Sequence, residues 1–229
     1  MPRSGTSLLG GLLASTGCIG RPGEFFDPSK EPPDARANYR TFVERVVRSR
    51  SVGGVFGVKF VHNQLSSFLD ALRALPGNAE CTDRELLEQV LPQPRFVWVQ
   101  RRDIVAQAVS WWRAEKTGEW RLPVGATREP TSELPSFDFE EVDKLVAEIV
   151  RGNERWERWF AANQIQAHVV VYEELAANAV AMTKRVLGFL EIDLPDSAGI
   201  APHLEQQADE LNVLWTQRYR ERAALPREG

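Results

Sequence analysis

Leucine residues near the start of the chain recur with the spacing of an α-helix. Leu8, Leu9, Leu12 and Leu13 stand at positions i, i+1, i+4 and i+5, which places them on one face of a helix. The pattern predicts a helix over residues 5–16 with one buried side.

Further along the chain, short apolar runs alternate with helical patterns. The three predicted units are a strand at 54–61 with a helix at 64–75, a strand at 96–99 with a helix at 103–116, and a strand at 169–171 with a helix at 176–191. Continuous apolar strands that alternate with helices are typical of a parallel sheet covered on both faces. We therefore predict an α/β fold, with a parallel sheet flanked by helices on both faces.

Two longer amphipathic segments complete the pattern, and they predict helices over 142–160 and 203–222. A segment rich in Pro, Thr and Ser precedes the first of them and predicts a flexible loop over 121–140. Nothing in the 229 residues reads as an internal repeat. We therefore expect one domain over residues 1–229.

Composition and charge exclude several classes of protein. With a net charge of -4, the chain does not resemble a nucleic-acid binder, which usually carries excess Lys and Arg. Its two cysteines, Cys18 and Cys81, lack the spacing of a zinc site and favour neither a metal nor a disulfide scaffold. No apolar run approaches the ~20 residues of a membrane span, and none near the start reads as a signal peptide. We therefore expect a soluble cytoplasmic protein without an integral membrane segment.

The beginning of the predicted sheet lacks one strand. In an α/β fold, a glycine-containing loop that opens a helix normally follows a strand, whereas here only Met1 and Pro2 precede the loop. The first strand is therefore expected to be missing, either because the start codon is assigned too far downstream or because the sheet is one strand short.

The loop before the first helix has the chemistry of an anion site. It contains a cation, a glycine and three hydroxyls in the run Arg3-Ser4-Gly5-Thr6-Ser7. The N–H groups at a helix N-terminus bind phosphate together with such side chains. The run is not a nucleoside-triphosphate loop, because it lacks the Gly-Lys pair of GxxxxGK[ST]. The alternative is an ordinary helix start capped by Ser4.

A second polar constellation follows the strand at 96–99. Arg102 stands at the carboxyl end of that strand, where ligands of open α/β sheets gather, and can bind a phosphate through two hydrogen bonds. Ser110 lies eight residues later, about two helical turns along, on roughly the same face. The alternative is a plain strand-to-helix turn with a surface arginine.

Together the two constellations resemble the 5′- and 3′-phosphate motifs of sulfotransferases, and in particular the bacterial trehalose 2-sulfotransferase family. The matching text runs in order along nearly the whole chain: "RSGTSLL", "TGCIGRPGEFF", "GVKFVHNQ", "RRDIVAQAVSWWRAEKTGEW" and "QADELNVLWTQRYR". This resemblance implies a P-loop-like sulfotransferase fold with 3′-phosphoadenosine 5′-phosphosulfate (PAPS) as co-substrate and no metal. It also implies a carbohydrate or glycolipid acceptor and, in many members, a homodimer.

The resemblance assigns roles to individual residues. Residues 3–7 match the 5′-phosphosulfate cradle, and Arg102 with Ser110 matches the 3′-phosphate clamp. Glu24, in "GRPGEFF", matches the carboxylate proposed as general base, which takes a proton as an acceptor hydroxyl attacks sulfur. Negative charge then grows on the leaving 5′-phosphate, where Arg3 serves as a catalytic donor together with the cradle amides.

Other residues are candidates for binding the acceptor. Lys59, His62, Asn63 and Gln64 follow one another closely in "GVKFVHNQ". Of these, Lys59 has a structural ion pair as an equal alternative, and a lone histidine such as His62 is more often a plain polar residue. Tryptophan rings stack on sugars, which makes Trp112 and Trp120 candidates, although Trp111 or Trp112 is expected to point to the core.

Two departures from the family keep other functions open. The family commonly has an arginine directly before "QAD", where this chain has Gln206, and the segment at 121–140 on the acceptor side matches poorly. The alternatives are a small-molecule kinase with a degenerate phosphate loop, and a non-catalytic binder of adenosine bisphosphate or a glycan.

Overall fold

The computed structural model describes residues 1–33, 35–120, 136–196, 198–201 and 210–225. The helices are α1 Thr6–Ser15, η1 Ala35–Asn38, α2 Tyr39–Arg50, α3 His62–Arg73, α4 Asp83–Val90, α5 Ile104–Thr117, α6 Phe139–Ala162, α7 Tyr172–Ala177, α8 Ala179–Phe189 and α9 Glu210–Ala223. The strands are β1 Val97–Gln100 and β2 His168–Val171. The predicted loop at 121–140 lies mostly outside the described residues, as do Gln206 and the start of the predicted helix at 203–222.

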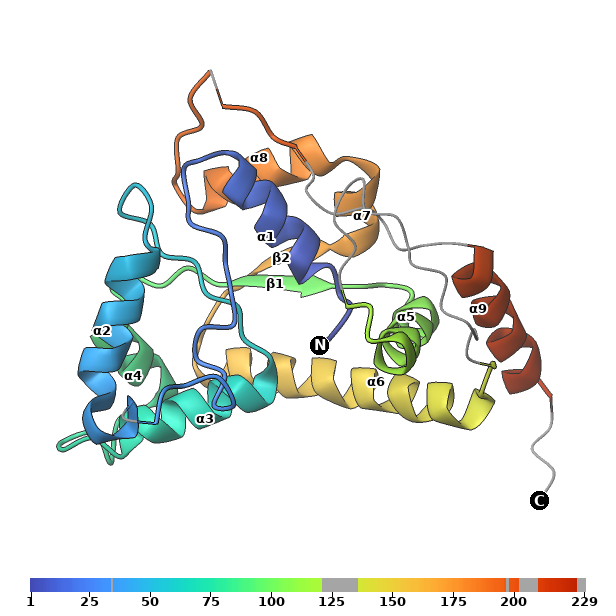
Figure 1. The fold of residues 1–229 in the computed structure, drawn as a ribbon, viewed down its shortest axis with the longest axis horizontal. Coiled ribbons are helices and arrows are strands. Elements are labelled where there is room, and N and C mark those ends of the chain that lie inside the picture. Colours follow the sequence, from blue (N-terminus) through green and yellow to red (C-terminus); the bar gives the residue numbers. More distant parts are fainter. Residues whose placement is uncertain (34, 121–135, 197, 202–209, 226–229) are drawn as a thin grey trace.

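The two strands form a parallel pair at the centre of the molecule (Figure 1). Their register runs from Val97 beside His168 to Gln100 beside Val171. Val99 and Val170 are paired and are 7% and 0% exposed, so the face of the pair that they share is buried, whereas Val169 on the opposite face is 45% exposed. Both strands agree with the predicted apolar runs, and the fold class is confirmed.

The predicted strand at 54–61 is wrong, because the segment makes only isolated bridges. Gly53 and Gly54 adopt positive φ, and this turn lets Val55 bridge back to Val52. A single parallel bridge then joins Val58 to Gly23. Within the described residues, the sheet therefore has only two strands, and the segment after Val55 instead fastens the Gly23 loop.

Helices cover both faces of the pair. In Figure 1, α1, α7 and α8 lie on one side and the long helix α6 on the other. Leu12 of α1, Val170 and Leu187 of α8 share one buried cluster. A second cluster joins α5, α6 and α9, and a third gathers the aromatic residues of α2, α3 and the end of α6.

Two helices begin at the carboxyl edge of the strand pair. The helix α5 begins directly after β1, where the side chain of Asp103 accepts the N–H of Ala106 as an N-cap. Helix α7 begins at Tyr172, directly after β2. The predicted helix at 176–191 is instead two helices, because Asn178 ends α7 and caps α8 by accepting the N–H of Ala181.

Candidate active site

A cavity of about 920 Å³ opens where the N-terminus of α1 meets the carboxyl ends of β1 and β2 and one side of α9. Its charged lining is mostly positive. The cations are Arg3, Lys30, Lys59, Arg101 and Arg220, and the carboxylates are Glu24 and Asp103. Within the described residues, the cavity therefore carries the charge expected of a site for a polyanionic ligand.

The backbone at the start of α1 follows the sharp path of an anion cradle. Gly5 has a φ of 103° and forms the N-cap without a side-chain hydrogen bond. A Cβ atom at Gly5 would lie 2.6 Å from Cδ2 of Tyr172, so both conformation and space require glycine here. Gly5, Thr6 and Ser7 line the cavity, and the first-turn N–H groups have no side-chain cap.

Ser4 does not act as the helix cap that the sequence left open as an alternative. Its side chain is 2% exposed, it does not line the cavity, and its Oγ has no hydrogen-bond partner within the described residues. The structure therefore brings four of the five predicted cradle residues to the cavity and places Ser4 behind them.

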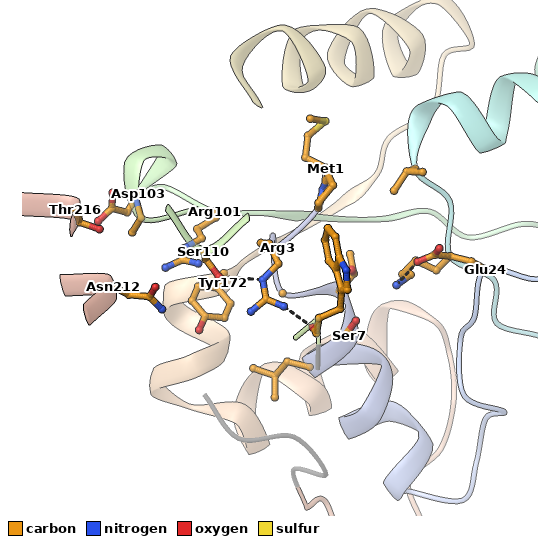
Figure 2. A pocket seen from close by; sticks show the side chains of 18 of the residues that line it. Met1, Arg3, Ser7, Glu24, Arg101, Asp103, Ser110, Tyr172, Asn212 and Thr216 are labelled. Atoms are coloured by element: carbon orange, nitrogen blue, oxygen red, sulfur yellow. Dashed lines mark hydrogen bonds and ion pairs between the residues drawn. The ribbon is translucent and has the colours of Figure 1, made fainter. Parts of the chain in front are cut away.

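Arg3 lies at the centre of the cavity (Figure 2). Its Nε donates to Oγ of Ser110 over 2.9 Å, and its Nη1 donates to the backbone oxygen of Trp120 over 2.5 Å. Burial, followed by the nearby charge of Arg101, lowers the pKa of Arg3 below its usual value. Two cations whose charges interact in this way favour a negatively charged ligand beside them.

The neighbouring arginines after β1 have different surroundings. The guanidinium of Arg101 lies 4.6 Å from the ring centre of Tyr172 and lines the cavity. Its buried Nε makes no hydrogen bond within the described chain and lies 3.9 Å from Oε1 of Glu173. Arg102, which the sequence singled out, is exposed, does not line the cavity and pairs with Glu174 of α7. Ser110 lines the cavity, so only one member of the predicted 3′-phosphate clamp faces it.

Glu24 is held at the edge of the cavity by two donors. Its Oε1 lies 2.6 Å from Nζ of Lys59, and its Oε2 accepts from Nε2 of Gln64 over 3.2 Å. Partial burial opposes ionisation, but the hydrogen bonds from Lys59 and Gln64 and the charges of Lys59 and Lys30 together outweigh it. They hold the pKa of Glu24 below its usual value, so this carboxylate is ionised at neutral pH.

The two aromatic residues after Glu24 fasten its loop. Phe26 is 1% exposed, and its ring centre lies 4.5 Å from that of Phe68 in α3. The N–H of Lys59 donates to the oxygen of Gly23 over 2.9 Å. Glu24 is therefore positioned by an anchored ring on one side and by a backbone contact on the other.

The remaining predicted residues separate into two groups. Trp120 lines the cavity and is 44% exposed, whereas Trp112 is buried at the α5–α9 contact, with its ring 5.0 Å from that of Trp215. His62 packs against the ring of Trp156, and neither it nor Asn63 lines the cavity. Trp112 is thus the tryptophan that points to the core.

Several cavity residues were not predicted from the sequence, among them Tyr172, Asp103 and Arg220. Tyr172 supports both Gly5 and Arg101, and its position directly after the β2 strand was an available signal. Asp103 receives two hydrogen bonds, of 2.8 and 2.9 Å, from Arg220 of α9. Because Asp103 caps α5 and Arg220 belongs to α9, their contact depends on tertiary packing and had no local signal.

None of the helices in the described ranges is both long and apolar enough to cross a membrane. Among the same residues, no group of three His, Cys, Asp or Glu side chains is arranged to hold a metal ion.

Comparison with known proteins identifies the class to which this fold and cavity belong. The family model described as Stf0 sulphotransferase matches residues 1–222, and the chain therefore belongs to the Stf0 sulphotransferase family. It is similar to the trehalose 2-sulfotransferase of Mycobacterium tuberculosis, at 30% identity over 257 aligned residues that cover 99% of this chain and 94% of the relative. The trehalose 2-sulfotransferase of Mycolicibacterium smegmatis is 29% identical, with 98% and 94% covered.

Proposed function

We propose that the protein transfers a sulfuryl group from PAPS to a hydroxyl of a carbohydrate acceptor, with Glu24 as the general base. The observation that carries the proposal is the joint placement of an uncapped helix N-terminus, Arg3 and an ionised Glu24 on one cavity. The trehalose 2-sulfotransferases to which the chain is similar support a carbohydrate as acceptor.

The residues on the cavity fit the donor. The positive φ of Gly5 turns the backbone sharply into α1, and the N–H groups of the first turn attract the charge of a phosphosulfate. Arg3 and Ser110 add side-chain donors beside that turn. The Nε of Arg101, which makes no hydrogen bond within the described residues, is a further donor for the ligand.

The reaction assigns a task to each of these groups. The acceptor oxygen forms a bond to sulfur, the bond between sulfur and the bridging oxygen breaks, and the 5′-phosphate leaves. Glu24 takes the proton of the hydroxyl, and the donors at α1 and Arg3 stabilise the charge that grows on the leaving oxygen. Lys59 keeps Glu24 ionised until this transfer.

The finer assignments rest on the resemblance. Arg102 remains our proposed ligand of the 3′-phosphate. Its exposed contact with Glu174 is of a kind worth about 0–1 kcal/mol, and a phosphate bound through two hydrogen bonds is strong enough to replace it. A cytoplasmic location, a glycolipid acceptor and a homodimer are likewise proposals.

Calorimetric titration with adenosine 3′,5′-bisphosphate, the donor product, tests the donor assignment. We expect binding at micromolar concentrations without a metal ion. The absence of binding up to about millimolar ligand, or binding of ATP with Mg²⁺ in its place, would reject the proposed function. Binding without transfer to any carbohydrate would indicate a non-catalytic binder.

The same titration tests the clamp. We expect Arg102→Ala to weaken binding of the bisphosphate by about tenfold or more, because the 3′-phosphate loses a charged donor. Arg95→Ala is the matched control, since Arg95 forms a similar exposed pair with Glu191 at the opposite end of β1. Unchanged affinity in Arg102→Ala, with a loss in Arg101→Ala, would transfer the role to Arg101.

A further inference from the structure

A second cavity of about 550 Å³ adjoins the first. It lies between the loop at 20–25 and the end of α2, and it shares Ser7, Glu24, Lys30 and Lys59 with the larger cavity. Glu24 therefore faces both spaces. A molecule in the second cavity would place a hydroxyl beside the carboxylate that faces the donor site.

The second cavity has more positive than negative side chains, because four cations line it beside one carboxylate, Glu24. Lys59 pairs with Glu24, and Lys30 pairs with Asp27 over 2.9 Å. Arg21 and Arg50 also line the cavity, and neither has a carboxylate within ion-pair distance in the described chain. Among the described residues, the cavity thus presents two arginines that no carboxylate of the chain neutralises.

The structure holds Arg50 in place without neutralising it. Its guanidinium lies 5.3 Å from the ring centre of Phe25, the residue after Glu24, so the arginine is stacked while its N–H groups keep their hydrogen-bonding capacity. The carbonyl oxygen of Arg50 lies so close to Gly20 that a Cβ atom there would be at 2.3 Å. This contact brings the end of α2 against the loop that carries Arg21.

The position of Arg50 in the last turn of α2 offers a simpler explanation, since basic residues there offset the helix dipole. The same explanation applies to Arg48 of the last turn. This residue is exposed and lines neither cavity. The explanation does not apply to Arg21, which belongs to a loop. Two arginines from separate elements that meet on one cavity indicate a ligand with negative charge.

We propose that the second cavity binds an acceptor that carries a phosphate monoester beside its reacting hydroxyl, with Arg21 and Arg50 as the phosphate ligands. This inference rests on the proposed function, because it assigns the acceptor of the same transfer. A neutral disaccharide would offer these two arginines no negative partner. The proposal therefore distinguishes this protein from an enzyme whose acceptor is a neutral disaccharide.

The test compares trehalose with trehalose 6-phosphate as ligands of the protein already saturated with adenosine 3′,5′-bisphosphate. Saturation fills the donor cavity, so a sugar phosphate cannot bind there in its place. We expect the phosphorylated sugar to bind at least about tenfold more tightly than the neutral one. The same order is expected in kcat/KM when PAPS is the donor.

Single variants assign the preference to the two arginines. We expect Arg21→Ser and Arg50→Ser each to reduce it severalfold and the double variant to remove it, while Arg48→Ser keeps it. Thermal unfolding of each variant controls for loss of fold. Equal binding of the two sugars, tighter binding of trehalose, or a preference that survives in the double variant would overturn the proposal.

The two proposals fail in different ways. If the bisphosphate binds and trehalose is sulfated as well as its phosphate, the sulfotransferase assignment stands and the phosphate site is wrong. If the bisphosphate does not bind, the donor assignment fails first. In that case, a preference for trehalose 6-phosphate that disappears with Arg21 and Arg50 would still support an anion site.

Discussion

Replacement of Glu24 by glutamine is expected to lower the rate of sulfuryl transfer by about 10²-fold or more, as the loss of a general base does. Affinity for the donor product should change little, because the donor meets α1 and Arg3 and not this carboxylate. Glutamine keeps the contact with Gln64 but leaves Lys59, whose side chain is 15% exposed, without its partner. We therefore also expect a modest loss of thermal stability.

The pH dependence of the transfer rate also tests Glu24 as the general base. The pKa of Glu24 lies below its usual value of 4.5, so the carboxylate stays ionised, and able to accept a proton, above that pH. The base is lost only as pH falls through the lowered pKa. Glu24 should therefore contribute no decrease in rate between about pH 8 and about pH 5, which initial rates of transfer measure.

Asp27→Asn provides the matched control for Glu24→Gln. Asp27 belongs to the same loop and also pairs with Lys30, yet it lines neither cavity. Its loss should leave turnover within about threefold of the parent protein, in line with the small worth of exposed pairs. If Glu24→Gln kept turnover at that level too, Glu24 would not be the base.

The spacing of apolar residues along the chain was enough to predict the first helix and both strands. The predicted helix at 5–16 agrees with α1, and the apolar runs at 96–99 and 169–171 agree with β1 and β2. The strand predicted at 54–61 does not form, because β-branched residues favour a strand only where a neighbouring strand pairs with them. Here the turn at Gly53 and Gly54 folds the chain back on itself. Neither α2 nor α4 was predicted from the sequence.

The candidate site, too, was predictable only where residue type and spacing along the chain identify it. The cradle at 3–7 and Ser110 were recognisable from residue type and spacing, and all but Ser4 reach the cavity. Which of Arg101 and Arg102 faces it depends on Tyr172 and Glu174 of helix α7, about 70 residues away along the chain. The sequence also gave no sign that Gln64 would contact Glu24, since the two meet only through tertiary packing.

The positive charge of the site has a cost in stability. Burial disfavours the charge of Arg3, and the nearby charge of Arg101 adds to this penalty. Arg3 also adopts a positive φ of 59°, which is unfavourable for a residue with a side chain. Such features persist where function requires them. The positive cluster of Arg3 and Arg101 is therefore expected to bind anions while it lowers the stability of the free protein.

Replacement of Arg3 by methionine is expected to separate these two effects. Methionine has similar length and fills the same space without charge, so the repulsion with Arg101 and the burial penalty both disappear. We expect the melting temperature of the free protein to rise by about 2–4 °C, equivalent to about 1 kcal/mol. The rate of transfer should fall by about 10²-fold or more, because a donor that meets the leaving oxygen is lost.

Thermal unfolding with and without adenosine 3′,5′-bisphosphate measures both effects in one series. The bisphosphate should raise the melting temperature of the parent protein, since a ligand that binds the folded state stabilises it, and should raise that of Arg3→Met much less. Arg48→Met, on the exposed face of α2, should respond to the ligand like the parent. A fall in the melting temperature of free Arg3→Met would instead show that its hydrogen bonds to Ser110 and Trp120 outweigh the repulsion. Arg3 would then support the fold as well as the ligand.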